Sequence, residues 1–458
     1  MNHFQHLSRR RPLSLGLLFC VLSAVGCSCD QGSASGADGG ARDSAVVGLD
    51  AADAQLMPDD ADTAPADGSV TPDRDAGPDI PVDLPGSIDG VEPEAHANHP
   101  PMIDGNGSLY RITESTQAEG NNPRMMRSTD SGATWAEADE GNRPGARDLE
   151  GCWQLQFGSE IYVSVAANRR VWFQIFHTSD AAERPDEWVF HEQVGPDLVN
   201  EGGVAQFSSL ARTSDGQIWL FHSDSMISGR QQIGFRRRSA SGVWSDERAI
   251  GETSGSWTGP RALLGEGDVT HVFYADHLAD RLYWRTLSPS GELSSATRLD
   301  TSGTSSERLP HTNAVYYDHA GAEVLVVAFA DDAGILRAIT ITDGEVGAEV
   351  AISPQPVLEN PGIALNDGTV AHLAIDGTTV HALWVDLASG DVLHSARPHG
   401  GAWSAPVVAW DSGADGAWWV YGNVYRRGGR RRLGFTYDID DHPDDEGHIE
   451  YDEITLGL

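Results

Sequence analysis

The sequence predicts an all-β protein: a β-propeller of seven blades, each of four antiparallel strands, preceded by an export signal and a linker. Short runs rich in Val, Ile, Tyr, Phe and Trp recur with Gly, Asp and Ser turns between them, which is typical of strands. No stretch has convincing helical periodicity, and the composition changes sharply near residue 95. We therefore expect a signal at 1–27, a linker at 28–95 and the propeller at 96–458.

The net charge limits the classes of partner. The 458 residues include 31 Arg, no Lys and 68 Asp or Glu, which gives a formal charge of −37. Nucleic-acid binding depends on basic residues that neutralise phosphates, so a nucleic-acid partner is not expected. The same imbalance argues against a polybasic contact with anionic lipids.

The first segment is expected to direct export. Three arginines at 9–11 precede an apolar run at 13–25, which is shorter than the about 20 residues of a membrane-spanning helix. The run ends in Ala24-Val25-Gly26-Cys27, which resembles a bacterial lipobox, although Ala24 stands where Leu is usual. The resemblance implies a diacylglyceryl group on Cys27 and a lipid anchor in the cell envelope. Because Ser28 is not the Asp associated with inner-membrane retention, the outer membrane is favoured; an ordinary cleaved signal is the alternative.

The second segment is expected to be a disordered, extended tether. Residues 28–95 carry 16 acids against two Arg and contain no Phe, Tyr or Trp. Such a segment cannot bury enough apolar surface to offset its chain entropy. A calcium-binding repeat is the alternative, which the irregular Asp spacing disfavours. Cys29 and Cys152 are too few for a disulfide framework; a bridge between them is conceivable, but Cys152 is expected to be a buried apolar residue.

The third segment repeats with the period of a propeller blade. Runs expected to be second strands begin 52 to 57 residues apart, at 109–112, 161–165, 218–221, 270–274, 324–329 and 380–385. Tryptophan often opens the fourth run, at Trp135, Trp188, Trp244 and Trp403. A seventh unit at 418–456 shows three runs, and the segment 85–94 could supply its fourth strand. Six blades, one of them irregular, is the alternative.

One motif lies between the third and fourth strands of the first unit. In Ser128-Thr129-Asp130-Ser131-Gly132-Ala133-Thr134-Trp135, the Asp can accept turn N–H groups, the Gly permits a positive φ, and the Trp can pack between blades. The motif resembles that of the Asp-box (BNR-repeat) propellers, the group that includes the sialidases. The resemblance implies that Asp130 is structural and lies on the face away from an active site. Degenerate copies follow at 177–188, 239–244 and 395–403.

The sialidase resemblance also implies three arginines that grip a carboxylate, a Tyr–Glu nucleophile pair and an Asp acid/base. Tyr110-Arg111-Ile112 is similar to the Phe/Tyr-Arg-Ile-Pro motif of that family, but Thr113 replaces the Pro and the run is an expected second strand. Tyr421 and Tyr425 are candidates for the nucleophile, with core packing as the alternative. No sialidase signature is present to assign catalytic residues.

Candidate ligand-binding residues follow from position. Propeller ligands generally sit at a mouth of the channel formed by the starts of the inner strands and by the loops joining second to third strands. Candidates there are His96, His99, Glu201, Trp257, Arg261, Arg308, His311, Glu359, Arg230, Asp276 and His277. We take His99, His277 and His311 as candidates for proton transfer, and Trp257, Arg261, Arg308 and Glu359 as candidates for ligand binding. Scattered polar residues at a solvated rim are the alternative.

Two charged stretches lie close together near the C-terminus. Asp438, Asp440, Asp441 and Asp444 have the hard oxygen ligands that suit Ca²⁺, although Pro443 excludes an EF-hand loop; a solvated charge run is the alternative. The arginine-rich stretch at 426–432 is expected to be an exposed hairpin turn that could pair with those carboxylates or meet an acidic polysaccharide. Apart from calcium, no cofactor is expected.

The sequence therefore favours a surface-tethered lipoprotein whose propeller binds carbohydrate or another extracellular ligand at the channel mouth. A glycan-cleaving enzyme, either a sialidase-like hydrolase or a polysaccharide lyase, is the second hypothesis. A structural scaffold within an envelope complex is the third.

Overall fold

A computed structural model describes residues 100–114, 123–139, 149–167, 170–195, 208–227, 230–252, 259–276, 281–302, 313–357, 371–386, 388–413, 416–439 and 448–457. The predicted signal, the lipidation site Cys27, the linker and the segment 85–94 lie outside these residues. Among the described residues, the structure holds no helix whose length and apolarity would let it cross a membrane.

The described residues form seven antiparallel sheets, which confirms the predicted seven-bladed propeller; the six-bladed alternative is wrong. Blade 1 is β1 (Met102–Ile103), β2 (Leu109–Glu114), β3 (Pro123–Ser128) and β4 (Ala136–Glu137); blade 2 is β5 (Leu149–Phe157), β6 (Glu160–Ala167), β7 (Arg170–His177) and β8 (Glu187–Gln193). Blade 3 is β9 (Ser208–Arg212), β10 (Ile218–Ile227), β11 (Arg230–Arg238) and β12 (Arg248–Glu252); blade 4 is β13 (Arg261–Leu264), β14 (Thr270–Asp276), β15 (Arg281–Leu287) and β16 (Thr297–Arg298). Blade 5 is β17 (Asn313–His319), β18 (Ala322–Ala330), β19 (Ile335–Thr342), β20 (Glu345–Val346) and β21 (Val350–Pro356). Blade 6 is β22 (His372–Asp376), β23 (Thr379–Val385), β24 (Val392–Pro398) and β25 (Val407–Trp410); blade 7 is β26 (Ala417–Arg427), β27 (Arg430–Ile439) and β28 (His448–Thr455).

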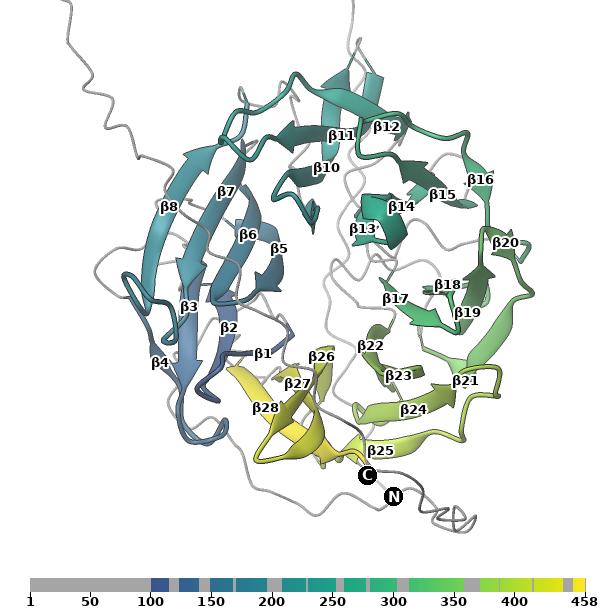
Figure 1. The fold of residues 1–458 in the computed structure, drawn as a ribbon. Helices are drawn as coiled ribbons and strands as arrows, with labels where there is room; N and C mark the ends of the chain where they lie inside the picture. The colour runs from purple at the N-terminus through teal and green to yellow at the C-terminus, as the bar shows by residue number, and fades with distance from the viewer. Residues whose placement is uncertain are drawn as a thin grey trace, which may run out of the picture. The chain divides into compact units, whose positions relative to one another are not determined.

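The seven sheets stand in a ring, with the first strand of each blade nearest the centre (Figure 1). Two blades depart from the simple pattern. In blade 5, β20 and β21 both pair with β19, so two strands, of two and seven residues, take the outer position. In blade 7, the described residues form three strands in the order β26-β27-β28, as the sequence predicted.

Each blade buries both faces against its neighbours, because alternate side chains of a strand point to opposite faces of a sheet. On β23, Ala382 and Trp384 join the apolar cluster between blades 5 and 6, whereas Leu383 and Val385 join the cluster between blades 6 and 7. A one-residue slip of this strand would exchange the two sets, so the packing fixes the register. The inner strand of each blade is thereby held beside the channel.

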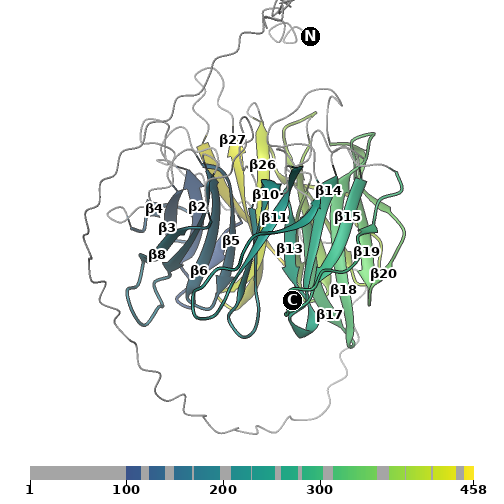
Figure 2. The same cartoon turned by 90° about the horizontal axis from the view of Figure 1, so that it is seen from above.

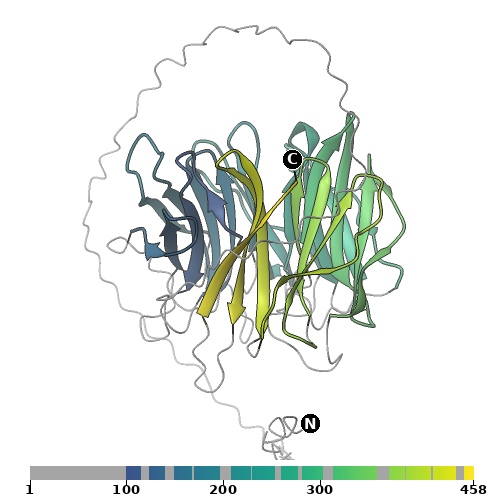
Figure 3. The ribbon, with the colours of Figure 1, turned by 90° about the horizontal axis from the view of Figure 1, so that it is seen from below.

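The strands run from one face of the propeller to the other, as the edge-on views show (Figures 2 and 3). We call one of these faces the hairpin face: it carries the turns between the first and second strands, at 104–108, 158–159, 213–217, 265–269, 320–321, 377–378 and 428–429. The turns between third and fourth strands, including the turn at 128–135, lie on this face too, because antiparallel strands alternate in direction.

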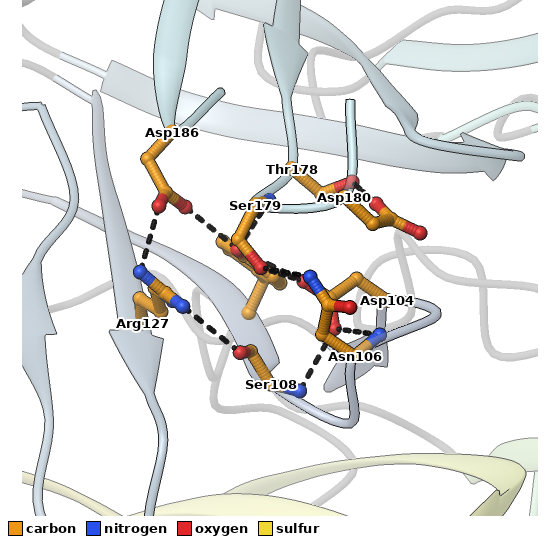
Figure 4. A network of polar contacts seen from close by, with 9 residues as sticks. Asp104, Asn106, Ser108, Arg127, Thr178, Ser179, Asp180 and Asp186 are labelled. Carbon is orange, nitrogen blue, oxygen red and sulfur yellow. Dashed lines mark hydrogen bonds and ion pairs between the residues drawn. The ribbon is translucent and has the colours of Figure 1, made fainter. Parts of the chain in front are cut away.

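A polar network at the hairpin face joins blade 1 to blade 2 (Figure 4). The Tyr110 hydroxyl donates to Asp186 Oδ1 at 2.7 Å and accepts from the backbone N–H of Ser179 at 2.8 Å. Arg127 donates to the other oxygen of Asp186 at 2.7 Å, and the Ser179 hydroxyl donates to the Asp104 carboxylate. Burial, with the Asp186 carboxylate beside it, raises the pKa of Tyr110, so this hydroxyl remains a donor at neutral pH.

The turn at 128–135 has the hydrogen bonds expected from its residues. Asp130 accepts from the backbone N–H and the hydroxyl of Thr134 at 2.8 and 2.6 Å, and Gly132 has a φ of 91°. The Ser128 hydroxyl accepts from the Gly132 N–H at 2.8 Å, and the Trp135 indole N–H donates to the Gly132 carbonyl at 3.0 Å. Burial alone would raise the pKa of Asp130, but the bonds from Thr134 and Ser128 lower it below its usual value. The turn is therefore built as a local structural unit.

Candidate functional site

The inner strands of the seven blades surround a cavity of about 660 Å³ in the central channel. All seven blades contribute to its lining. The cavity extends from Trp153, in the middle of β5, to Phe157 and Gly158, where that strand turns at the hairpin face. It therefore lies in the half of the channel opposite to the mouth that the sequence singled out.

Three amide side chains brace the short inner strand of blade 1 from both sides. Gln154 and Gln156 reach it from blade 2, and Asn423 reaches it from blade 7. Their N–H groups donate to the carbonyl oxygens of Pro100, Ile103 and Pro101, respectively. Since each amide keeps a carbonyl oxygen, these side chains can also accept hydrogen bonds.

Arg261 reaches across the channel. It begins β13 in blade 4, and its guanidinium carbon lies 3.7 Å from the centroid of the Trp153 ring in blade 2. Its Nη2 atom donates to the carbonyl of Ala314 in blade 5 at 3.4 Å. Among the described residues, no carboxylate lies within ion-pair distance of this guanidinium. Burial lowers the pKa of Arg261 to about 9, so it remains a cation at neutral pH.

A second arginine lies at the hairpin-face end of the cavity. Arg212 ends β9, and its guanidinium carbon stands 3.6 Å from the ring centroid of Phe157 and 5.6 Å from that of Tyr162. Phe157 keeps 51% of its surface exposed, which marks this end of the cavity as open to solvent. An exposed aromatic ring and a cation thus stand together at the mouth.

His372 contributes the one histidine of the described lining. It begins β22 and is 4% exposed, and its Nδ1 accepts the backbone N–H of Gly422 at 3.1 Å. Because Nδ1 is the acceptor, the neutral ring carries its proton on Nε2. The ring of Tyr421, on the neighbouring strand β26, crosses it edge-on at 5.4 Å between centroids. The Tyr421 ring therefore packs beside a histidine of the cavity lining, although Tyr421 does not itself belong to that lining.

The charge of the cavity is opposite to that of the chain. Its described lining includes Arg212 and Arg261 but neither Asp nor Glu. The sequence from 96 to 458 has 26 Arg against 52 acids, a formal charge of −26. The cavity lining is therefore positively charged, whereas the propeller segment as a whole is negatively charged.

Of the residues singled out from the sequence, Arg261 is the one that the structure places at the cavity. Arg230 and Asp276 lie at strand ends. The others lie outside the described residues: His96, His99, Glu201, Trp257, His277, Arg308, His311 and Glu359. Most of these belong to the loops that precede the inner strands, so their candidacy stays a prediction.

The predicted calcium ligands are also untested. Asp438 lies in β27, whereas Asp440, Asp441 and Asp444 lie outside the described residues. Within the ranges that the structure describes, no group of three or more His, Cys, Asp or Glu side chains is arranged to hold a metal ion.

The arginine-rich stretch forms the tight turn between β26 and β27, with Gly428 and Gly429 at positive φ. Two of its arginines form ion pairs with acids that do not belong to the acidic run at 438–446. Arg431 contacts Asp376 at 2.9 Å, and Arg427 contacts Glu453. The turn is therefore tied to blades 6 and 7.

Tyr425 lies in the packed blade and not in the cavity lining. It is 6% exposed, and its hydroxyl donates to Glu453 Oε1 at 2.6 Å beside Tyr451. Burial and the Glu453 charge raise the pKa of Tyr425 well above its usual value. Tyr425 is therefore a packing residue, which was the alternative weighed from the sequence.

Four residues of the cavity lining were not predicted from the sequence: Trp153, Arg212, Phe157 and His372. Arg212 and Phe157 each end an inner strand just before a turn, and this position is a signal that could have found them. Trp153 and His372 carry no such signal, because their approach to Arg261 and Tyr421 depends on how separate blades meet around the axis.

Comparisons with known protein families and with curated proteins find no match. Among solved structures, an ulvan lyase is similar over 81% of this chain and 97% of its own, at 11% identity and a TM-score of 0.49. The Aleuria aurantia lectin is similar over 69% of this chain and 97% of its own, at 13% identity and a TM-score of 0.43. An α-L-arabinofuranosidase from Fusarium graminearum is similar over 69% and 97%, at 16% identity and a TM-score of 0.45. At such low similarity, the ligand of this chain is to be argued from its own side chains.

Proposed function

We propose that this chain is a lipid-anchored propeller of the bacterial cell envelope that binds carbohydrate in its central channel. The cavity supports the binding role, because it combines aromatic rings with amide groups along one accessible path. Aromatic rings pack against the apolar faces of sugars, and amides exchange hydrogen bonds with their hydroxyl groups. Trp153 and Phe157 supply the rings, and Gln154, Gln156 and Asn423 supply the amides.

Glycan-array binding followed by titration tests this role. We expect Phe157→Ala to weaken binding about 10-fold, because an aromatic contact contributes roughly 1 kcal/mol beyond its buried area. Since Phe157 is 51% exposed, its removal should leave the fold intact. Val408→Ala is the matched control, at a site 47% exposed on the outer strand of blade 6. A protein that binds no glycan on the array would refute the proposal.

The proposed location in the cell envelope rests on the sequence alone. The run that ends at Cys27 supports lipidation, and the acidic segment that follows supports a tether between lipid and propeller. Labelling with radioactive palmitate should mark the wild type and not Cys27→Ser. Fractionation should place the wild type with the outer membrane; a soluble, unlabelled wild type would overturn the assignment.

A glycan-cleaving enzyme is the second candidate, and the His372–Tyr421 pair favours it. Because the Nδ1 atom of His372 already accepts the Gly422 N–H, its neutral ring can only donate a hydrogen bond, and the adjacent Tyr421 phenol is the group that would exchange a proton with a bound sugar chain. Product analysis separates the two roles, since binding without cleavage supports the first. Released reducing sugar or an unsaturated uronate that disappears in Tyr421→Phe would support the enzyme.

We also propose, from the sequence alone, that Asp438, Asp440, Asp441 and Asp444 hold a structural calcium ion. Calcium should then raise the melting temperature and EDTA should lower it. Equal melting temperatures in both buffers would remove this site.

A further inference from the structure

We propose that the channel cavity selects the anionic group of its ligand, a carboxylate or a sulfate carried on a sugar, and that Arg212 and Arg261 hold it. The inference rests on the proposed binding role and adds the chemical class of the ligand and the face by which it enters. The ligand enters at the hairpin face, past Phe157; this is the face of the Asp130 turn and not the face that the Asp-box resemblance implied for an active site.

The first observation is the sign of the cavity's charge. The chain has 68 acids against 31 Arg, yet the described lining has two Arg and neither Asp nor Glu. With low-dielectric walls, charges of one sign raise the local concentration of the opposite ion. Positive charge kept in the channel of a strongly acidic protein points to a negative ligand.

The second observation is the state of Arg261. Its guanidinium is stacked on the Trp153 indole at 3.7 Å, and its described hydrogen-bond acceptor is one backbone carbonyl at 3.4 Å. A planar guanidinium can donate two parallel hydrogen bonds to a carboxylate or sulfate, and the indole keeps that plane oriented. An anion would also offset the loss of hydration that lowers the pKa of this group.

The third observation is the order of the two arginines along the channel. Arg212 stands at the mouth over Phe157. Arg261 lies deeper in the channel. The N–H of the next residue, Ala262, donates to the hydroxyl of Ser209, which precedes Arg212 by three residues on β9 and so lies further from the hairpin face. Arg261 precedes Ala262 and therefore lies level with Ser208, four residues from Arg212. At about 3.3 Å a residue, the two arginines are roughly 13 Å apart along the axis. An acidic sugar chain can therefore meet one cation at the mouth and the other inside.

Binding of paired acidic and neutral probes tests the proposal. The probes are tetragalacturonic acid and neutral galactotetraose, titrated by calorimetry at one ionic strength. We expect the acidic probe to bind at least 10-fold more tightly than the neutral one. Arg212→Gln and Arg261→Gln should each lower its affinity about 10- to 100-fold, as loss of a hydrogen bond to a charged group does. Arg261→Lys, which keeps the charge but not the fork, should restore part of the loss.

Arg430→Gln is the matched control. Arg430 is exposed on the same face and lies outside the cavity lining, so its variant removes the same net charge. A loss of affinity in Arg430→Gln equal to that in the channel variants would overturn the inference. Sodium sulfate, compared with sodium chloride in thermal melts, should raise the melting temperature of the wild type more than that of the Arg212→Gln/Arg261→Gln double variant.

The outcomes separate the inference from the proposed function. Equal affinity for the acidic and the neutral tetrasaccharide would refute the proposed preference for an anion but leave the proposed carbohydrate binding intact. Binding of sulfate without either sugar would support the anion site and refute the carbohydrate ligand. No response to any probe would refute both.

Discussion

Two buried histidines between blades 6 and 7 should make the propeller unstable in mild acid. His381 on β23 and His394 on β24 are 5% and 9% exposed, and their Nδ1 and Nε2 atoms lie 3.0 Å apart. Burial lowers the pKa of His381 to about 4, with Asp376 and Arg431 acting in opposite directions. Burial and the neighbouring His381 charge lower the pKa of His394 to about 3. The folded protein therefore keeps both rings neutral at a pH where the unfolded chain is protonated.

The sign and size of the effect follow from these values. Above the unfolded pKa of 6.5 both states are neutral, so the pair has no effect on the pH dependence. As the pH falls below 6.5, the unfolded chain takes up protons first, and the free energy of unfolding falls until the folded pKa is reached. At pH 5 each histidine should cost roughly 2 kcal/mol relative to pH 8, and the pair roughly 4 kcal/mol.

Urea unfolding at pH 8 and pH 5 measures this loss. Other groups titrate in the same range, so the test is the difference between the wild type and a His381→Asn/His394→Phe double variant. The double variant should lose less stability by roughly 4 kcal/mol between the two pH values. His319→Gln, at an exposed site on β17, is the control and should lose as much as the wild type. If the double variant loses as much stability as the wild type, the argument from burial is wrong.

Two further substitutions test the seam between blades 7 and 1 by urea unfolding. Gly132→Ala should cost about 2 kcal/mol or more, because Gly132 has a φ of 91° and an added Cβ would overlap the Tyr451 ring. Gly107→Ala, at a φ of 88° in open space, should cost less, and equal losses would contradict the argument from overlap. Glu453→Ala should cost about 3–5 kcal/mol, because it leaves the Arg427 charge without its carboxylate. A loss below about 1 kcal/mol would mean that water replaces the carboxylate.

The blades could be predicted from sequence because their signals are local. Each blade is predicted from apolar strand runs, from the turns between them and from their recurrence along the chain. The turn that contains Asp130 and Gly132, with Gly132 at a positive φ, is specified by its own residues. The number of blades then followed from the repetition, because each of the seven units shows the same weak pattern of strands and turns. The one blade whose sequence lacked a run is the one that has three described strands.

The cavity could not be predicted in the same way. Trp153 and Arg261 are separated by a whole blade in sequence, and they meet because seven sheets converge on one axis. The ligand contacts predicted from the sequence belong to the loops before the inner strands, where Arg308 and Glu359 lie outside the described residues. The described cavity is built instead by the strands themselves, whose side chains look like ordinary strand residues in a linear sequence.

The channel and the exterior should act on an acidic ligand in opposite ways. A chain of net charge −37 repels an anion at long range, whereas the arginines attract it after it has entered the cavity. Salt shortens the reach of exposed charges, from about 30 Å at 0.01 M to about 8 Å at 0.15 M, but screens buried contacts much less. The association rate of tetragalacturonic acid should therefore rise with salt over this range, and its dissociation rate should change little. Stopped-flow binding would measure both rates. An association rate that falls with salt would mean that attraction, not repulsion, governs the approach, and the charge of the hairpin face would then have to be positive as well.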